Sequence, residues 1–323
     1  MRIADHLITP QDSVDIRHDV RPIGFVDLAA WPAHVDMLAA PFPLIGIGDP
    51  AHPLRNALDA IAEPPISAEG VFENVLKAPQ AAAACAQLLR STESLPAPDA
   101  LRLESLCYAM LQGSAEHAAW LAAQPAPVAP ALGQKADCLR LDRQDDTLIV
   151  HLDQPGTLNA IDRDMRDALY AALEMALIDP EIRLIKLRAE GRAFSVGADL
   201  AEFGTTHDPA TAHAIRMRTL PATLLAALPC LFDVHARGAA IGSGLEVAAF
   251  ATTFTAGSDA WFQLPEIAMG IIPGAGGCVS IPERIGRSRA LLMMLSGRKL
   301  NAKQALEWGL IDAIEDRPAR DEH

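Results

Sequence analysis

The sequence predicts an α/β protein in which a mostly helical N-terminal module precedes a domain of alternating strands and helices. Three observations carry this prediction. Residues 138–323 alternate short apolar runs with longer helical patterns, residues 1–121 hold mainly helical patterns, and residues 122–137 are rich in proline. Strand-then-helix alternation builds α/β domains whose functional groups lie on the turns after the strands.

The N-terminal module, residues 1–121, begins with a short α/β segment. The apolar run 44–47 predicts a buried strand, and Gly48-Asp49-Pro50 predicts a turn that leads into a helix. Helical patterns then cover residues 68–90, with an alanine-rich centre, and residues 98–122. The module is therefore expected to be mostly helical after its first 60 or so residues.

Residues 122–137 separate the two parts of the chain. Pro125, Pro127 and Pro130 interrupt any helix or central strand there. We interpret the segment as an extended linker, and a surface loop within one domain is the alternative.

The segment after the linker, residues 138–323, is predicted to form an α/β domain, which the motifs described below indicate to be the catalytic domain. Asp162 is placed to cap a helix, and Pro221 is expected to divide a later one. The expected strands are 147–152, 184–187 and 231–235, and the expected helical stretches are 162–176, 210–228 and 245–251.

Charge and apolar pattern exclude several classes of protein. The chain has 41 acidic and 27 basic side chains and a net charge of −14, which argues against nucleic acid as a partner. No apolar run is long enough to cross a bilayer, and the first residues lack the pattern of a secretory signal. We expect a cytoplasmic protein that binds no membrane.

Cysteine and histidine patterns predict neither disulfides nor a metal site. The five cysteines lack a Cys-x-x-Cys pair and are expected to be reduced. His52, Glu116 and His117 show no metal-ligand spacing, so we expect surface positions or satisfied side chains.

Three glycine-containing turns, 191–200, 237–246 and 263–277, carry the chemical signal of the sequence. The first two enter helices, where free backbone N–H groups can face an anion. Two such donors that converge on one oxygen form an oxyanion hole. Each turn alone has a simpler explanation, because glycine also permits tight turns and acidic residues cap helices.

Taken together, these turns resemble the crotonase superfamily, the enoyl-CoA hydratase/isomerase family. The resemblance covers about 145–314, whereas no part of 1–137 resembles it. The matching segments are LNAID (158–162), AFSVGADL (193–200), GAAIGSGLEVA (238–248), LPEIAMGIIPGAGG (264–277) and RKLNAKQALEWGLIDAI (298–314). The resemblance implies a crotonase-like spiral of ββα units.

The resemblance assigns backbone roles to several positions. It implies that the N–H groups of Ala198 and Ser243 bind the thioester oxygen, although most relatives have glycine in place of Ser243. Ser195, Val196 and Ala198 match positions that bind coenzyme A through backbone groups. Gly274 matches a glycine whose backbone orients the water or the acyl end.

The resemblance also implies an acid–base pair, Glu246 and Glu266, as found in the hydratases of this family. One ionised glutamate would activate water and its partner would exchange the proton at Cα. Burial of two carboxyl groups near one water should push their pKa values apart. The alternative is that both carboxylates only stabilise helix starts. Asp199, His235 and Cys278 are expected to be structural.

The resemblance therefore implies a lyase of fatty acid metabolism that hydrates a 2-enoyl-CoA to a 3-hydroxyacyl-CoA. An isomerase, hydrolase or decarboxylase of the same fold is one alternative, and a non-catalytic CoA-binding or scaffold protein is another. The acyl-CoA is the expected substrate, with no permanently bound cofactor and no metal. A homo-oligomer, trimeric or other, is also implied.

One departure from the family concerns its C-terminal helices. Relatives continue beyond the segment that matches 309–314 with helices that cover the acyl pocket and help to form trimers, whereas this sequence stops at His323. We therefore expect the N-terminal module to replace those helices as a lid or as an oligomer surface.

Overall fold

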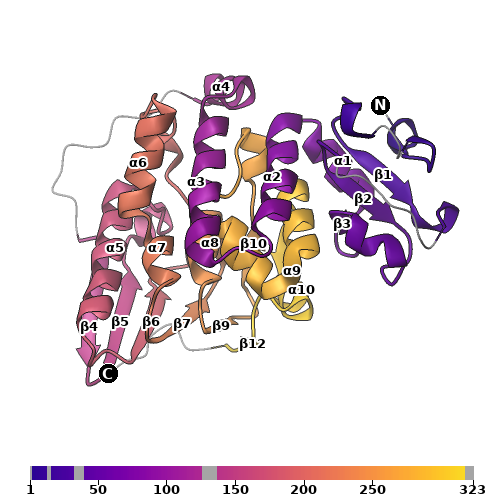
Figure 1. The fold of residues 1–323 in the computed structure, drawn as a ribbon. Helices are drawn as coiled ribbons and strands as arrows, with labels where there is room; N and C mark the ends of the chain where they lie inside the picture. Colours follow the sequence, from indigo (N-terminus) through magenta and orange to yellow (C-terminus); the bar gives the residue numbers. More distant parts are fainter. Residues whose placement is uncertain (1, 13–15, 33–39, 126–136, 317–323) are drawn as a thin grey trace.

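The computed structural model describes residues 2–12, 16–32, 40–125 and 137–316. Most of the predicted linker, residues 126–136, lies outside the described residues. The ribbon in Figure 1 confirms the predicted α/β class, with helices packed along sheets of mainly parallel strands.

A six-stranded sheet forms one layer of the catalytic domain, in the order β12-β9-β7-β6-β5-β4. All its neighbouring strands are parallel except β4 and β5, which form an antiparallel pair. In β5 every second side chain is buried, so one face of the strand packs against the helices. The strands are β4 (Leu139–Gln144), β5 (Thr147–Leu152), β6 (Leu184–Ala189), β7 (Leu231–Ala236), β9 (Thr253–Ala256) and β12 (Ala313–Ile314).

A second, three-stranded sheet has the order β11-β10-β8. Strand β8 (Ala239–Ile241) pairs in parallel with β10 (Trp261–Gln263), which pairs antiparallel with β11 (Leu300–Asn301). A single bridge between Ser195 and Ala240 joins the first glycine-containing turn to β8. This sheet therefore brings the three glycine-containing turns together.

Helices occur in the three predicted stretches 162–176, 210–228 and 245–251, whereas the helices Gly277–Ser296 and Ala302–Trp308 lie outside every predicted stretch. The carboxylate of Asp162 accepts a hydrogen bond from the N–H of Met165, which confirms the predicted cap, and Pro221 begins a new helix. The helices are α5 (Arg163–Ile178), α6 (Pro209–Thr219), α7 (Pro221–Leu225), α8 (Ser243–Ala248), α9 (Gly277–Ser296) and α10 (Ala302–Trp308).

Within its described residues, the N-terminal module has four α-helices where the sequence predicted two longer stretches. The first stretch breaks before Pro79, which has no N–H for an intrahelical bond, and the second breaks at Gly113-Ser114, where Ser114 caps the next helix. The helices are α1 (Ala68–Val75), α2 (Pro79–Thr92), α3 (Ala97–Gln112) and α4 (Ala115–Ala122).

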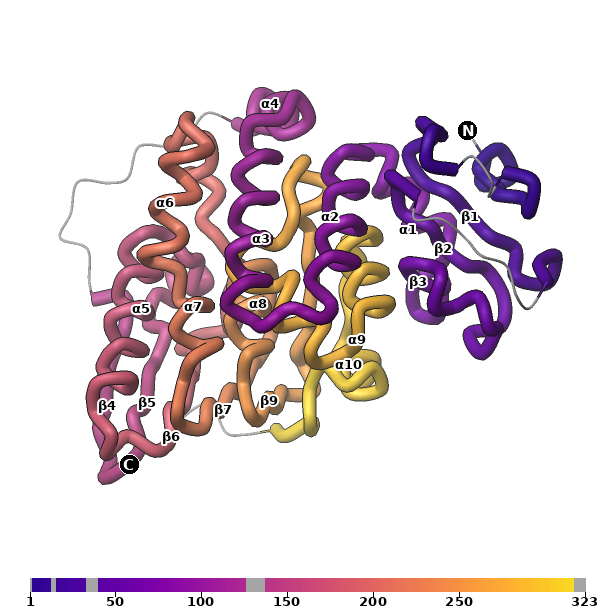
Figure 2. Tube along the Cα trace, viewed as in Figure 1, coloured from indigo at the N-terminus to yellow at the C-terminus, as the bar shows by residue number. Residues whose placement is uncertain are grey.

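Helices α1 to α3 pack directly on the catalytic domain. In Figures 1 and 2, α3 lies beside α6, and α2 lies between α3 and α9. One buried apolar cluster includes Val71 of α1, Ala82 of α2 and Leu291 of α9. The predicted module therefore shares its core with the catalytic domain, as a covering element would.

A small parallel sheet lies at the far end of the molecule in Figure 1. It consists of β1 (Gly24–Asp27), β2 (Leu44–Ile47) and β3 (Ala60–Ile61). Some of its apolar side chains belong to a separate core cluster, whereas Phe25, Ile45 and Ala60 belong to the main one. Asp59 attaches the sheet to the helices. Its carboxylate is 2 % exposed and lies 2.5 Å from Arg90 of α2 and 3.4 Å from Arg287 of α9.

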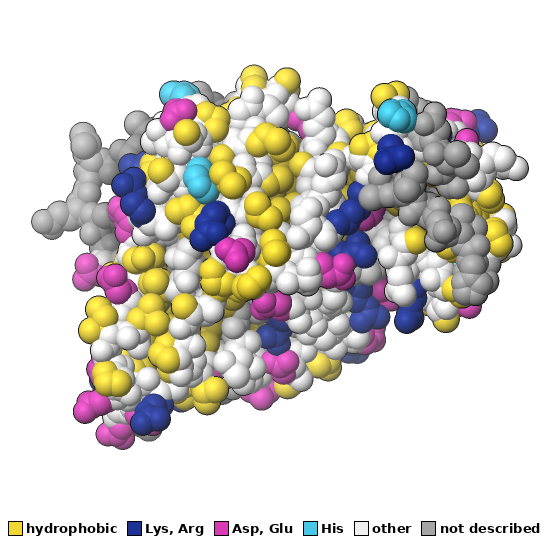
Figure 3. Space-filling model, viewed as in Figure 1, with side chains coloured by type: hydrophobic (Ala, Val, Ile, Leu, Met, Phe, Trp, Pro, Cys, Tyr) yellow, Lys and Arg dark blue, Asp and Glu magenta, His cyan; other side chains and the backbone are white. Residues whose placement is uncertain are grey.

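Several large apolar side chains are exposed on α3 and α5, and Figure 3 shows hydrophobic side chains gathered over this helical face. The exposed ones on these two helices are Leu103, Leu106, Met110, Met175 and Ile178. The homo-oligomer implied by the sequence stays a prediction. Among the described residues, no helix is both long and apolar enough to span a membrane.

The contacts of Asp59 predict a large effect on stability. Replacement of Asp59 by Asn should lower the free energy of unfolding by about 3 kcal/mol, because the largely buried Arg90 loses its counter-charge and Arg287 keeps only the exposed Glu93. The exposed pair Asp99–Arg102 provides the control, and Asp99→Asn should cost less than about 1 kcal/mol. Urea denaturation measures both values, and equal effects would contradict this account.

Candidate active site

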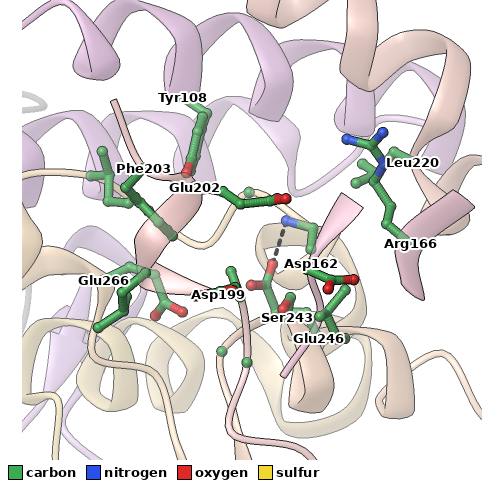
Figure 4. A pocket seen from close by; sticks show the side chains of 18 of the residues that line it. Tyr108, Asp162, Arg166, Asp199, Glu202, Phe203, Leu220, Ser243, Glu246 and Glu266 are labelled. Carbon is green, nitrogen blue, oxygen red and sulfur yellow. Dashed lines mark hydrogen bonds between the residues drawn. The ribbon is translucent and has the colours of Figure 1, made fainter. Parts of the chain in front are cut away.

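The three glycine-containing turns meet at a cavity of about 260 Å³. The catalytic domain supplies most of its lining, and α3 of the N-terminal module closes one side (Figure 4). Of the residues that the sequence predicted for the site, the cavity lining includes Val196, Ala198, Ser243, Glu246, Glu266 and Gly274. The structure thus brings together residues from all three turns.

The cavity-lining residues Ala198, on the first turn, and Ser243, the first residue of α8, have backbone N–H groups without a protein acceptor among the described residues. The first helical residues of any α-helix have N–H groups without an intrahelical acceptor, which accounts for Ser243. The hydroxyl of Ser243 is buried and also lacks a hydrogen-bond partner. These donors are therefore available to a ligand.

The carboxylate of Glu246 is held by the third turn. One oxygen, Oε2, accepts hydrogen bonds from the N–H groups of Ala275 at 2.6 Å and Gly277 at 2.8 Å. The side chain is 2 % exposed. Burial raises the pKa of Glu246 to about 7, while the two N–H groups oppose this shift. Both amides bind the same oxygen, so Oε1 is free of them.

Glu266 begins the short 3₁₀ helix η8 (Glu266–Met269) and differs from Glu246 in its surroundings. It is 8 % exposed, and its Oε2 is buried without a hydrogen-bond partner among the described residues. Burial, and next the negative charge of Glu246, raise the pKa of Glu266 well above its usual range. Glu266 thus favours the protonated form more strongly than Glu246 does.

Close backbone approaches explain two of the site glycines. Gly242 has φ +48°, and a Cβ there would lie 2.7 Å from Oε1 of Glu266. A Cβ on Gly274 would overlap the ring of Tyr108, which comes from α3. Any side chain at either position would therefore displace a residue of the cavity.

Ser195 does not line the cavity. Its hydroxyl donates to the carbonyl of Asn159 at 2.7 Å, and its backbone N–H donates to Ala239. These bonds fix the first turn against β8. The contact with coenzyme A implied for Ser195 stays a prediction, as do the roles implied for the other site residues.

Three residues expected to be structural have structural contacts. Asp199 caps a 3₁₀ helix by accepting from the N–H of Ala201, and Nδ1 of His235 pairs with the hydroxyl of Thr255 at 2.8 Å. Cys278 is buried, and burial raises the pKa of its thiol well above the usual range, which disfavours the reactive thiolate. No cluster of potential metal ligands occurs among the described residues.

Sequence reasoning missed several residues of the site. Tyr108 and Glu104 of α3 lie at or behind the cavity, and Arg166 and Arg216 line it. The signal that could have found Glu104 and Tyr108 is the face of α3 defined by positions 101, 104, 105 and 108, at helical spacing. Glu104, Ser105 and Tyr108 are polar members of that face, so it did not stand out as apolar.

Comparison with known proteins identifies the class to which this fold and site belong. The model of the enoyl-CoA hydratase/isomerase family matches residues 142–319. The solved enoyl-CoA hydratase from Thermoplasma volcanium GSS1 is 33 % identical, with a TM-score of 0.52, over 56 % of this chain and 73 % of that one. The chain therefore has a crotonase-like fold.

Two curated relatives agree with this result. The 2,3-dehydroadipyl-CoA hydratase of Escherichia coli (strain K12) is 34 % identical over 176 residues, which are 54 % of this chain and 68 % of that protein. A probable mitochondrial enoyl-CoA hydratase of Arabidopsis thaliana is 35 % identical over 54 % of this chain and 58 % of its own length. The chain belongs to the enoyl-CoA hydratase/isomerase family, with a region before residue 142 that lies outside the family match.

The raised pKa of Glu246 predicts a specific dependence of stability on pH. The unfolded chain releases this proton near pH 4.5 and the folded protein near pH 7, so stability falls as pH rises between these values. Above pH 7 the loss from this group reaches about 3 kcal/mol. In Glu246→Gln the amide oxygen can still accept hydrogen bonds from both N–H groups. The free energy of unfolding of this variant should therefore fall by about 3 kcal/mol less than that of wild type over the same pH range.

Urea denaturation of both proteins at pH 5 and pH 8 measures this difference. Glu104 and Glu266 remain in the variant, but the charge of Glu246 contributes to their raised pKa values, so the difference between the two proteins includes this coupling. The same fall in stability for wild type and Glu246→Gln would contradict the buried, proton-holding state of Glu246.

Proposed function

We propose that the chain adds water to a 2-enoyl-CoA to give a 3-hydroxyacyl-CoA. The observation that carries this proposal is a pair of buried carboxyl groups, Glu246 and Glu266, in one cavity with two free backbone N–H groups. Hydration needs this set, because it requires a base for water, an acid for Cα, and donors for the negative charge that develops on the thioester oxygen.

In this proposal the N–H groups of Ala198 and Ser243 bind the thioester oxygen. As water adds to Cβ, electron density moves to that oxygen, and fixed donors stabilise the enolate-like state without reorganisation. The donor of Ser243 is a backbone group, so the serine side chain does not remove it. The buried hydroxyl of Ser243 instead narrows the space beside the acyl group.

The acid and base follow from the surroundings of the two carboxyl groups. Glu246, with a pKa near 7, takes the proton of the attacking water through its free Oε1. Glu266 holds its proton more strongly and delivers it to Cα. Glu246 gains one proton and Glu266 loses one in each turnover. The two carboxyl groups then regain their starting protonation states by exchanging protons with solvent.

Coenzyme A is proposed to lie along the first turn, with backbone groups of Val196 and Ala198 near its adenine end. Ser195 lies behind them, where its hydrogen bonds hold the turn. Arg163 and Arg166 of α5 line the cavity and supply local positive charge, which the phosphates need because the chain as a whole is acidic. Gly274 would place its backbone beside the water or acyl end, under the ring of Tyr108.

The comparisons support hydration, because both curated relatives described above carry names of hydratases. An isomerase, hydrolase or decarboxylase of the same fold is the first alternative, and a non-catalytic CoA-binding protein is the second. We further propose that helix α3 acts as the lid of the acyl pocket, since Tyr108 closes one side of the cavity.

Hydration of crotonyl-CoA, followed by loss of enoyl absorbance, tests the proposal. Wild type should be active, and Glu246→Gln and Glu266→Gln should each lower kcat by about 10²- to 10⁴-fold, because each removes one proton-transfer group. Tight binding of CoA without turnover by wild type would favour the non-catalytic alternative. Turnover of a 3-enoyl-CoA in place of crotonyl-CoA would favour an isomerase.

The backbone donor at Ser243 can be removed separately. Proline is tolerated at the first position of a helix, where its missing N–H has no helical partner. Ser243→Pro should therefore fold and lower kcat by about 10²- to 10³-fold, whereas Ser243→Gly keeps the N–H and should stay within a few-fold of wild type. Equal kcat values for the two variants would contradict the proposed oxyanion hole.

A further inference from the structure

A third buried glutamate lies directly behind the catalytic cavity and comes from the N-terminal module. Glu104 is on α3, is 1 % exposed, and faces the start of α9. Its Oε1 accepts from the N–H of Gly276 and its Oε2 accepts from the N–H of Cys278, both at 2.8 Å. Both oxygens of this buried carboxyl group therefore accept hydrogen bonds from the backbone of another segment, which makes the contact geometrically specific.

The two carboxyl groups on this turn are interleaved. Glu246 binds the N–H groups of Ala275 and Gly277, and Glu104 binds those of Gly276 and Cys278. Four consecutive backbone donors therefore alternate between a residue of the catalytic pair and a residue of the N-terminal module. A shift of the turn toward or away from Glu104 must move the N–H groups that hold Glu246.

Helix α3 is itself fixed on the neighbouring helix α6. Arg216 donates to the hydroxyl of Ser105 at 3.1 Å and to the side chain of Gln112 at 2.9 Å, and its guanidinium lies 4.4 Å from the ring centroid of Tyr108. Tyr108 is one helical turn after Glu104 and covers Gly274 at the same turn. The position of Glu104 is therefore set by the packing of α3.

We propose that Glu104 is a positioning residue of the active site, which holds the 274–278 turn so that the carboxylate of Glu246 faces the substrate. This inference rests on the proposed hydratase function and extends it to the N-terminal module. Glu104 does not line the cavity and touches no reacting atom. Its contribution to turnover acts through the backbone of residues 275–278.

The protonation of Glu104 determines how its replacement affects the pH profile. Burial, and next the negative charge of Glu246, raise the pKa of Glu104 well above its usual range, so Glu104 favours the neutral form beside an ionised Glu246. The other titratable or charged groups around the two carboxyl groups are Glu266, Cys107, Tyr108, Arg216 and Cys278. A neutral amide at position 104 therefore leaves the charge next to Glu246 unchanged, and the acid limb of the rate profile, which reports the base, should stay near that of wild type.

Glu116 offers a matched control within the same module. Its Oε1 accepts from the N–H of Gln80 at 2.8 Å and its Oε2 from that of Ala81 at 3.0 Å, at the start of α2. Glu116→Gln thus removes the same number of charge-assisted bonds from a helix start that is not part of the cavity lining. Any effect of Glu104→Gln beyond that of Glu116→Gln is specific to the catalytic turn.

The experiment compares wild type, Glu104→Gln, Glu104→Asp and Glu116→Gln with crotonyl-CoA across pH. Glu104→Gln should lower kcat by about 10- to 100-fold with KM little changed, because one of its two acceptor oxygens becomes an NH₂ group that cannot accept from a backbone N–H. Glu104→Asp keeps the carboxyl group but has a shorter reach, so its kcat should also fall. The acid limb should stay near that of wild type in both variants. Glu116→Gln should keep both the kcat and the acid limb of wild type.

Hydrogen–deuterium exchange on the same four proteins provides a readout that does not need turnover. Exchange at residues 275–278 should rise in Glu104→Gln but not in Glu116→Gln, where the rise should fall on residues 80 and 81. If wild type does not hydrate crotonyl-CoA, the proposed function fails and the exchange result alone decides whether Glu104 holds the turn. Unchanged exchange, or an active wild type with unchanged kcat in Glu104→Gln, would overturn the inference.

Discussion

The start of helix α9 imposes the constraint on which the rest of the site depends. Four consecutive N–H groups, from Ala275 to Cys278, have no helical acceptor, and residues 276–278 are buried. Two buried carboxyl groups satisfy all four. Each carboxyl group loses hydration on burial, and the N–H groups compensate part of that loss, so neither partner is stable there without the other.

These hydrogen bonds connect the proposed catalytic residue Glu246 to the N-terminal module. Glu246 stands on α8 of the catalytic domain and Glu104 on α3 of the N-terminal module, so the turn between them holds the two parts in register. The apolar core that α1 and α2 share with α9 also holds the N-terminal module against the C-terminal part of the chain, over a larger area. The site is thus a pocket in which Glu246 and Glu266 come from the C-terminal part of the chain, while Glu104 behind it and Tyr108 over it come from α3.

The sequence predicted those features whose chemistry lies within one short segment. The glycine-containing turns, the cap at Asp162 and the break at Pro221 depend on neighbouring residues, so they could be recognised locally. The contact between Glu104 and Gly276 joins residues 172 positions apart, and no local pattern indicates such a pairing. The buried face of α3 also contains polar residues, so the usual apolar signal for burial was weak there. Ser114 caps the start of α4 inside the predicted stretch 98–122, so this stretch forms two helices and not one.

The structure of the chain with a non-reactive acyl-CoA bound is the most direct test of the central claim, that residues from both parts of the chain build one hydratase site. The account predicts the thioester oxygen within hydrogen-bond distance of the N–H groups of Ala198 and Ser243. It also predicts the acyl group between Glu246 and Glu266, with Tyr108 against its far end. A thioester bound away from these N–H groups, or an acyl group that makes no contact with α3, would contradict the account.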